Sequence, residues 1–170
     1  MISILALLLQ SAPAAAPAPW TVTPRPNADP TITSTVAGVS AADNNARLVL
    51  RCDVSPKGKF VSIQFFSRTA LGGPPNRPVS LTMDGGTPLI DNWEFVDKAA
   101  YTRSDAGVTT LAQALAAAKT IALHTTTTDG EPIDASFAGP GSDAPIKALL
   151  AKCDYQLGVV PVRAPEKKDK

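Results

Sequence analysis

The sequence predicts an α+β domain, in which an antiparallel sheet or meander of about six to eight strands carries two helices and one disulfide. Three observations carry this prediction. Hydrophobic and polar residues alternate along much of the chain, two later segments space their hydrophobic residues as a helix does, and the chain holds two cysteines. The chain has 170 residues, of which 44% are hydrophobic, so it is long enough to bury a core.

Turn residues separate the alternating segments and set the expected strand boundaries. We expect strands at residues 31–39, 46–53, 60–66, 79–84, 89–96, about 99–103, 119–127 and 133–137. Pro56-Lys57-Gly58 joins the second and third strands, so residues 46–66 are expected to form a hairpin. Asp84-Gly85-Gly86 is a second turn signal, after which the strand at 89–96 pairs back.

Two segments show helical spacing. Residues 107–118 place Val108, Leu111, Ala112 and Leu115 on one stripe, and Ser104 or Asp105 is the candidate N-cap. Residues 143–153 repeat the pattern with Ile146, Leu149, Leu150 and Cys153, and Ser142 is the expected cap. Strands followed by a helix, two strands and a helix are typical of the α+β class.

The N-terminus predicts export. Residues 2–9 form an apolar run, far shorter than the roughly 18 residues of a membrane-spanning helix. Ala12 and Ala14 then fit the small-residue pattern that signal peptidase recognises, although the first charge is only at Arg25. A buried N-terminal helix is the alternative, which the Ala/Pro-rich sequence disfavours. We expect a periplasmic or secreted protein, by Gram-negative-type export, with no membrane span once the leader is removed.

The chain therefore divides into four expected segments. They are a signal peptide at 1–14, a Pro/Ala-rich linker at 15–30, the α+β domain at 31–157 and a flexible charged tail at 158–170. Trp20 lies in the linker, where it is either a contact residue or docked on the domain. Its alternating neighbours favour docking.

The two cysteines are expected to form one disulfide in an oxidising compartment. Alternation places Cys52 on the hydrophobic face of its strand, and helical spacing places Cys153 on the hydrophobic stripe of the last helix. Both sulfurs would then face the contact between helix and sheet. Two unpaired buried thiols are the alternative, and a redox pair is disfavoured because no Cys-x-x-Cys motif is present.

Composition and motifs argue against several kinds of site. The chain has 16 Lys and Arg against 15 Asp and Glu, so its net charge of +1 disfavours nucleic acid as a partner. A zinc ribbon or finger is excluded by two cysteines and one histidine, His124. Because His124 is out of phase with Ile121 and Leu123, it is expected to face solvent rather than to act in catalysis. We expect no catalytic residue, no metal and no cofactor.

Candidate contacts with a partner come from three places in the chain: Trp20, Arg47, Arg51, Pro74 and Pro75. Arg47 and Arg51 share the polar face of one strand, where they would meet an anion or an acidic partner. A solvated face is the alternative explanation. The two prolines belong to a stiff loop at residues 71–78.

The order of these features resembles small exported bacterial proteins. The shared features are Arg51-Cys52 at the end of a strand, the Asp84-Gly85 turn followed by Trp93, a hairpin at 135–139 and a helix that ends in Lys152-Cys153-Asp154. Over roughly residues 46–154 the chain resembles the VasI-type accessory proteins of type VI secretion. It is more distantly similar to the invasion-associated locus B family, which usually carries more cysteines. The resemblance implies an exported, disulfide-stabilised envelope protein and supplies no catalytic residues.

We therefore expect a non-enzymatic interaction or accessory module of the bacterial cell envelope, whose partner is an envelope protein or polymer. One alternative is an envelope hydrolase that uses carboxylates, with Asp91, Glu94 and Asp97 as candidates. The other is an inhibitor of a foreign lysozyme or protease that presents the loop at 71–78.

Overall fold

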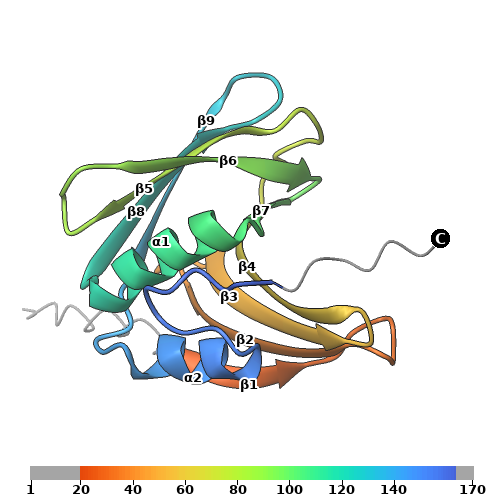
Figure 1. Cartoon of the computed structure of the whole chain (residues 1–170). Coiled ribbons are helices and arrows are strands. Elements are labelled where there is room, and N and C mark those ends of the chain that lie inside the picture. The colour runs from red at the N-terminus through yellow and green to blue at the C-terminus, as the bar shows by residue number, and fades with distance from the viewer. Residues whose placement is uncertain (1–19, 164–170) are drawn as a thin grey trace, which may run out of the picture.

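The structure, a computed structural model, describes residues 20–163. The expected signal peptide at 1–14 lies outside the described residues, as do residues 15–19 of the linker and 164–170 of the tail. The described residues form one antiparallel sheet of nine strands with two helices, which confirms the predicted α+β class (Figure 1). The elements are β1 Thr21–Arg25, β2 Thr33–Ser40, β3 Ala46–Ser55, β4 Gly58–Ser67, β5 Arg77–Met83, β6 Leu89–Val96, β7 Ala99–Thr102, α1 Asp105–Ala117, β8 Thr120–Thr126, β9 Pro132–Ala138 and α2 Ala144–Lys152.

The strands lie in the order β1-β2-β3-β4-β7-β6-β5-β8-β9. The hairpins β3–β4 and β5–β6 pair as their turn residues predict. The short strand β7 stands between β4 and β6, and it joins the first half of the sheet (β1 to β4) to the second half (β5, β6, β8 and β9). The sheet curls around α1, and we call the face toward the helices the inner face and the opposite one the outer face (Figure 1).

The first strand corrects the linker prediction. β1 pairs with β2 although it contains Pro24, which an edge strand tolerates because one side of its backbone needs no partner. Trp20 is buried, and its Nε1 donates a hydrogen bond of 2.9 Å to the Ala138 carbonyl oxygen at the end of β9. Because β1 and β9 are the two edge strands, this bond connects the two edges of the sheet. The prediction of a linker was wrong for residues 20–25. It rested on the prolines, whereas the alternation that follows Trp20 correctly indicated a strand.

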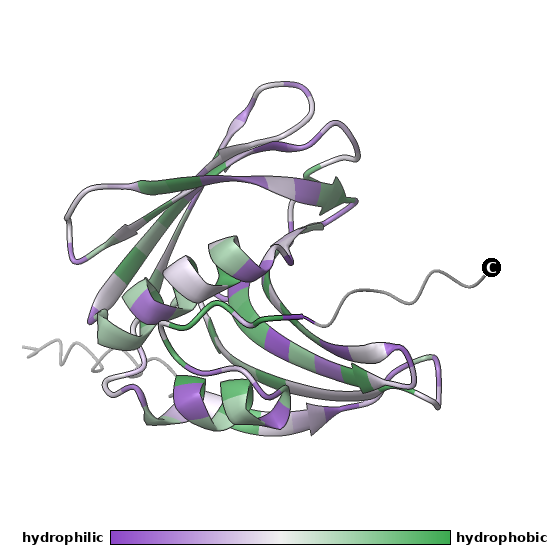
Figure 2. Cartoon of the chain, in the orientation of Figure 1, coloured by the Kyte–Doolittle hydropathy of each residue, from purple (hydrophilic) through white to green (hydrophobic). Residues whose placement is uncertain are grey.

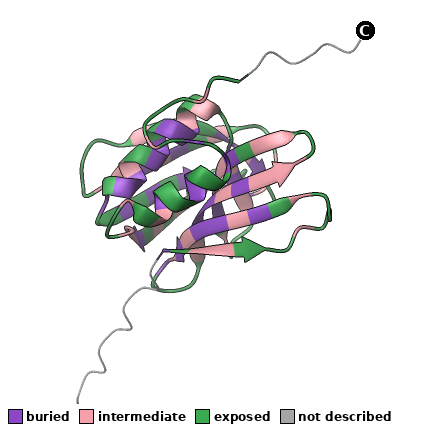
Figure 3. Cartoon of the chain, turned by 60° about the horizontal axis from the view of Figure 1, so that its bottom comes forward, coloured by how far each residue is buried: buried purple, intermediate pink, exposed green. Residues whose placement is uncertain are grey.

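Period-two alternation builds the inner face. In β4, Val61, Ile63 and Phe65 are buried, while the residues between them point outward. The bands of hydrophobic and hydrophilic residues along the strands are visible in Figure 2, and the buried residues gather where the sheet meets the helices in Figure 3. No helix among residues 20–163 combines the length and the apolar character that crossing a membrane requires.

The two helices begin differently. The Ser104 side chain accepts a hydrogen bond of 3.1 Å from the Gly107 backbone N–H, so Ser104 is the N-cap of α1. In α2 the prediction of Ser142 as the cap was wrong, because the N-cap is Asp143 and its side chain makes no capping bond. The Asp143 carboxylate instead pairs with Lys147 one turn later, at 2.6 Å.

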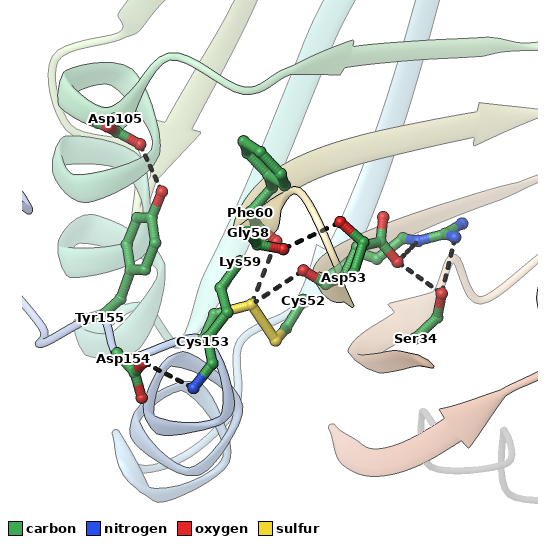
Figure 4. Close-up of a disulfide and its surroundings, with 12 residues drawn as sticks. Ser34, Cys52, Asp53, Gly58, Lys59, Phe60, Asp105, Cys153, Asp154 and Tyr155 are labelled. Atoms are coloured by element: carbon green, nitrogen blue, oxygen red, sulfur yellow. Dashed lines mark hydrogen bonds and ion pairs between the residues drawn. A yellow bond between two sulfur atoms is a disulfide. The ribbon is translucent and has the colours of Figure 1, made fainter. Parts of the chain in front are cut away.

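The predicted disulfide is present. Cys52 in β3 and Cys153 at the end of α2 are bonded, with their Cα atoms 5.8 Å apart (Figure 4). The bridge closes a sequence separation of 101 residues and fixes α2 on the inner face of the first half. Lys59 of β4 adds an ion pair of 2.6 Å to Asp154, the residue after the bridge.

The segment after α2 corrects the tail prediction for residues 158–163. Arg163 makes two bonds to the Asp105 carboxylate, of 2.5 and 2.7 Å, and its guanidinium lies 5.0 Å from the ring centre of Phe60. This part of the expected tail therefore runs across the domain. Its position depends on contacts between distant residues, which local sequence composition does not reveal.

Candidate functional site

The outer face of the first half carries a group of polar and aromatic residues that could contact a partner. Alternation turns Arg47, Arg51 and Asp53 of β3 away from the core, as predicted. The neighbouring strand β4 adds two exposed rings, Phe60 at 42% and Phe66 at 39% exposure. Tyr101 of β7 lies opposite Gln64 and continues the same face.

The larger hollow on this face has a volume of about 760 Å³. We call it the basic groove. It runs over β3, β4 and β7 and reaches the start of α1, and its lining combines cations, carboxylates and aromatic rings: Arg51, Lys57, Arg103 and Arg163 with Asp53, Asp105, Phe60 and Tyr101. Cationic and aromatic side chains together are typical of surfaces that bind acidic partners.

Two pairs of interactions shape the side of the groove near β7. The Tyr101 hydroxyl donates a hydrogen bond of 2.7 Å to Glu94, and this bond raises the pKa of the phenol. Arg103 lies 3.3 Å from the same carboxylate and 5.9 Å from the centre of the Tyr101 ring. Because Arg103 keeps 65% of its side chain exposed, it remains accessible to a partner.

The other end of the groove is closed by three residues that hold one another. Asp105 accepts hydrogen bonds from Arg163 and from the Tyr155 hydroxyl (Figure 4 shows the latter). The hydrogen bonds from Arg163, and to a smaller extent the bond from the Tyr155 hydroxyl, lower the pKa of Asp105. Burial, followed by the bond to Asp105, raises the pKa of Tyr155 to about 12. The start of α1 and the segment after α2 are therefore locked together beside the groove.

The smaller hollow on the same face measures about 280 Å³. We call it the arginine hollow, because Arg25, Arg47 and Arg51 line it together with Val36, Val49 and Phe66. Arg51 is the most firmly held of the three. Its Nε lies 2.8 Å from Asp53 Oδ1, and its Nη2 donates a bond of 2.9 Å to the buried hydroxyl of Ser34.

The structure brings together only two of the five predicted contact residues. Arg47 and Arg51 line the arginine hollow, whereas Pro74 and Pro75 line neither hollow. Both prolines are exposed, on the loop between β4 and β5. Trp20 is 5% exposed and hydrogen-bonded, so its candidacy as a contact residue was wrong and the docked alternative describes it.

The loop that carries Pro74 and Pro75 is held from within the second half. The Arg77 guanidinium donates hydrogen bonds of 2.8 Å to the carbonyl oxygens of Leu71 and Gly73. Its Cζ atom also lies 3.8 Å from the centre of the Phe95 ring. The Leu71 carbonyl oxygen also accepts a bond of 3.0 Å from the Thr128 backbone N–H. The β4–β5 loop and the β8–β9 turn are thus fixed to each other.

The candidate carboxylates of the hydrolase alternative do not converge. Asp91 and Glu94 differ by an odd number of residues in β6, so they point to opposite faces of the sheet. Asp97 lies in the β6–β7 turn, where its carbonyl oxygen accepts bonds from Leu71 and Gly72. Asp84, which follows β5, accepts hydrogen bonds from the backbone N–H groups of Thr120 and Lys119, and these bonds lower its pKa.

The only histidine faces outward, as alternation predicts. His124 Nδ1 lies 2.8 Å from Asp134 Oδ1, and Ser80 is its neighbour across β5 and β8. Serine, histidine and aspartate thus stand in one row on the outer face of the second half. The His124 and Asp134 side chains are 55% and 75% exposed, so the row lies in open solvent, where such interactions are weak.

Sequence reasoning missed the outward aromatic residues and four of the six cations that line the two hollows: Phe60, Phe66, Tyr101, Arg25, Lys57, Arg103 and Arg163. The phenylalanines had a usable signal, since Phe60 and Phe66 are out of phase with the buried Val61 and Ile63. Arg25 and Arg163 had none, because only the tertiary structure brings the two ends of the domain to this face.

The structure defines the class as a disulfide-linked α+β domain whose first half carries a hollow rich in cations on its outer face. Comparisons with family models, with curated proteins and with solved structures found no match. Within residues 20–163, no three His, Cys, Asp or Glu side chains gather in a way that could hold a metal ion.

Proposed function

We propose that this chain is an exported, non-enzymatic interaction module of the bacterial cell envelope, which binds an acidic protein through the outer face of its first half. The domain acts as a rigid platform, and the basic groove is the contact surface. The accessory role in type VI secretion that the resemblance implies is the narrower form of this proposal.

One observation supports the proposal most strongly: charge is unevenly distributed over the molecule. Six cationic side chains and two carboxylates line the basic groove and the arginine hollow, although the chain as a whole has 16 cationic and 15 acidic residues. Such a concentration of one sign favours the approach of an oppositely charged partner and speeds its association. Phe60 and Tyr101 offer apolar area within the groove, which is where binding energy concentrates at interfaces.

The disulfide supports the exported state. Cys52 and Cys153 form a disulfide. Disulfides persist in oxidising compartments and are rare in cytosolic proteins. We expect the mature protein from the envelope fraction to begin at residue 15 and to show no reactive thiol before reduction. Mass spectrometry of the intact protein measures both properties at once.

Capture from envelope extract tests the binding role. We expect immobilised wild-type protein to retain one or a few acidic proteins and to release them as salt is raised. The double variant K57E/R103E should lose this retention by about tenfold or more, because it reverses two charges of the groove. The control K119E/K152E makes the same change in net charge at exposed residues that line neither hollow, and it should bind as the wild type does.

Two results would contradict the proposal. In one, extracts from several growth conditions yield no protein that wild type retains above background. In the other, K57E/R103E and K119E/K152E weaken retention equally, which would mean that retention depends on the net charge of the protein and not on the basic groove.

A second candidate function rests on the β4–β5 loop. Pro74 and Pro75 are exposed, and Arg77 and Thr128 hold the loop that carries them. A fixed exposed loop suits an inhibitor that inserts into the active site of a foreign lysozyme or protease. Excess protein should then slow lysozymes or serine proteases, and a P74A/P75A variant should not. Full enzyme activity in the presence of excess wild type would remove this candidate.

A further inference from the structure

The arginine hollow has an apolar floor although it opens on the outer face. Val36 and Val49 are only 6% and 3% exposed, while both helices pack on the opposite face of the sheet. The other residues that line the hollow are the three arginines, Pro26, Gln64 and Phe66, which is 39% exposed. The hollow therefore combines a hydrophobic floor with three cationic side chains.

Two of the three arginines in the hollow form no ion pair within the described part of the chain. Among residues 20–163, neither Arg25 nor Arg47 forms an ion pair with a carboxylate, whereas Arg51 is paired with Asp53. Burial, and then the charge of Arg25, lowers the pKa of Arg47. Like charges that approach at a partly buried position repel each other, so an anion bound between them would be attracted by both.

We propose that the arginine hollow binds a small organic anion, in which a phosphate or carboxylate group is carried on a single ring or a short alkyl chain. Guanidinium groups bind such oxyanions through paired, charge-assisted hydrogen bonds, which assigns the charged end of the ligand to Arg25 and Arg47. Val36, Val49 and the Phe66 ring take the apolar end. At about 280 Å³ the hollow suits one ring rather than a lipid or a polymer segment.

This site goes beyond the proposed acidic protein partner. Lys57 and Arg103, the residues that test the basic groove, do not line the arginine hollow, and Arg25 and Arg47 do not line the groove. Loss of small-anion binding would therefore leave protein capture intact, and failed capture would leave small-anion binding intact. The two proposals fail separately.

The test is a titration of the folded domain, followed by NMR of the Val36 and Val49 methyl groups. The probes are phenyl phosphate and benzoate, with inorganic phosphate as the charge-only control and phenol as the ring-only control. We expect phenyl phosphate or benzoate to shift these methyl signals saturably and to bind about tenfold or more tightly than either control. The stronger of the two assigns the oxyanion.

Variants that keep the arginine stem but remove its charge complete the test. R25M and R47M should each weaken binding by about tenfold, because each loses a charge-assisted interaction, and R47K should weaken it less. R68M is the matched control, since Arg68 is exposed and lies outside the hollow. If R47M unfolds, the probe series on wild type still decides. The proposal is overturned if no probe gives a saturable shift up to millimolar concentration, if inorganic phosphate binds as well as phenyl phosphate and benzoate, or if folded R47M binds as wild type does.

Discussion

Both halves of the sheet bury hydrophobic residues on the inner face, but they differ in the interactions that hold them and in the residues that they present to solvent. The first half is held by α2 and by the Cys52–Cys153 bridge, and its outer face is basic. The second half carries no cysteine, and Arg77 of this half holds the β4–β5 loop through hydrogen bonds. Its outer face shows Ile90 and Val96, at 69% and 57% exposure, and the ion pair of His124 with Asp134.

This difference links covalent bracing to the candidate binding face. A face that gathers like charges loses some stability through repulsion, and the bridge lies directly beneath the groove that gathers them. The second half has no comparable concentration of charge on its outer face and holds together through packing and hydrogen bonds. We therefore expect the disulfide to preserve the shape of the candidate binding face as well as the stability of the domain.

Removing the bridge should have the largest effect on stability. The variant C52A/C153A is expected to lose about 4 to 5 kcal/mol of unfolding free energy, because the closed loop is long. Urea unfolding measures the loss, and reduced wild type is the control. Hydrogen exchange should speed up in α2, β2 and β3 well before it does in β8 and β9. A loss spread evenly over both halves would contradict the comparison.

Breaking the contact between the two edges of the sheet should rank next. Trp20→Ala is expected to lose about 3 to 5 kcal/mol, because a large buried side chain leaves a cavity. Trp20→Phe keeps an aromatic ring in the site but removes the bond to Ala138 and part of the packing, so it should lose about 1 to 2 kcal/mol. Thermal unfolding of both variants separates the two contributions. Equal losses in both would show that packing of the ring does not matter.

A tight backbone approach in the second half predicts a smaller effect. A Cβ at Gly139 would collide with the carbonyl group of Ala118, so Gly139→Ala should lose about 1 to 3 kcal/mol. Gly73→Ala is the matched control, because a Cβ there meets no atom within 4 Å. It should change stability by only a few tenths of a kcal/mol. Equal effects of the two substitutions would contradict the close approach of Gly139 to the Ala118 carbonyl group.

The two tyrosines predict a pH effect at the alkaline end. Both Tyr101 and Tyr155 have raised pKa values, and that of Tyr155 is about 12. A raised pKa means that the folded state favours the neutral phenol. The stability from Tyr155 is therefore complete below the unfolded pKa of about 10 and is lost as pH rises from there toward 12. Phenolate absorbance should titrate with a midpoint near pH 10 in urea and at higher pH in the folded protein.

The sequence predicted the local elements well and the long-range arrangement poorly. Alternation located β2 to β9 within a few residues, and the phases of Cys52 and Cys153 predicted the bridge. β7, however, stands between β4 and β6, and β8 pairs with β5, which no local pattern specifies. For the same reason, only part of the candidate site could be predicted. Arg47 and Arg51 lie in one strand and were found together, whereas Arg25 reaches them only through the pairing of β1 with β2.

Site-specific photocrosslinking in living cells tests the central claim most directly, namely that the outer face of the first half binds the partner. The photoreactive residue p-benzoylphenylalanine replaces Phe60 in the basic groove or, as the matched control, Ile90 on the second half; both positions are exposed. We expect the Phe60 position to yield a discrete adduct with an acidic envelope protein and the Ile90 position to yield none. An adduct from Ile90 alone, or no adduct from either position, would contradict the account.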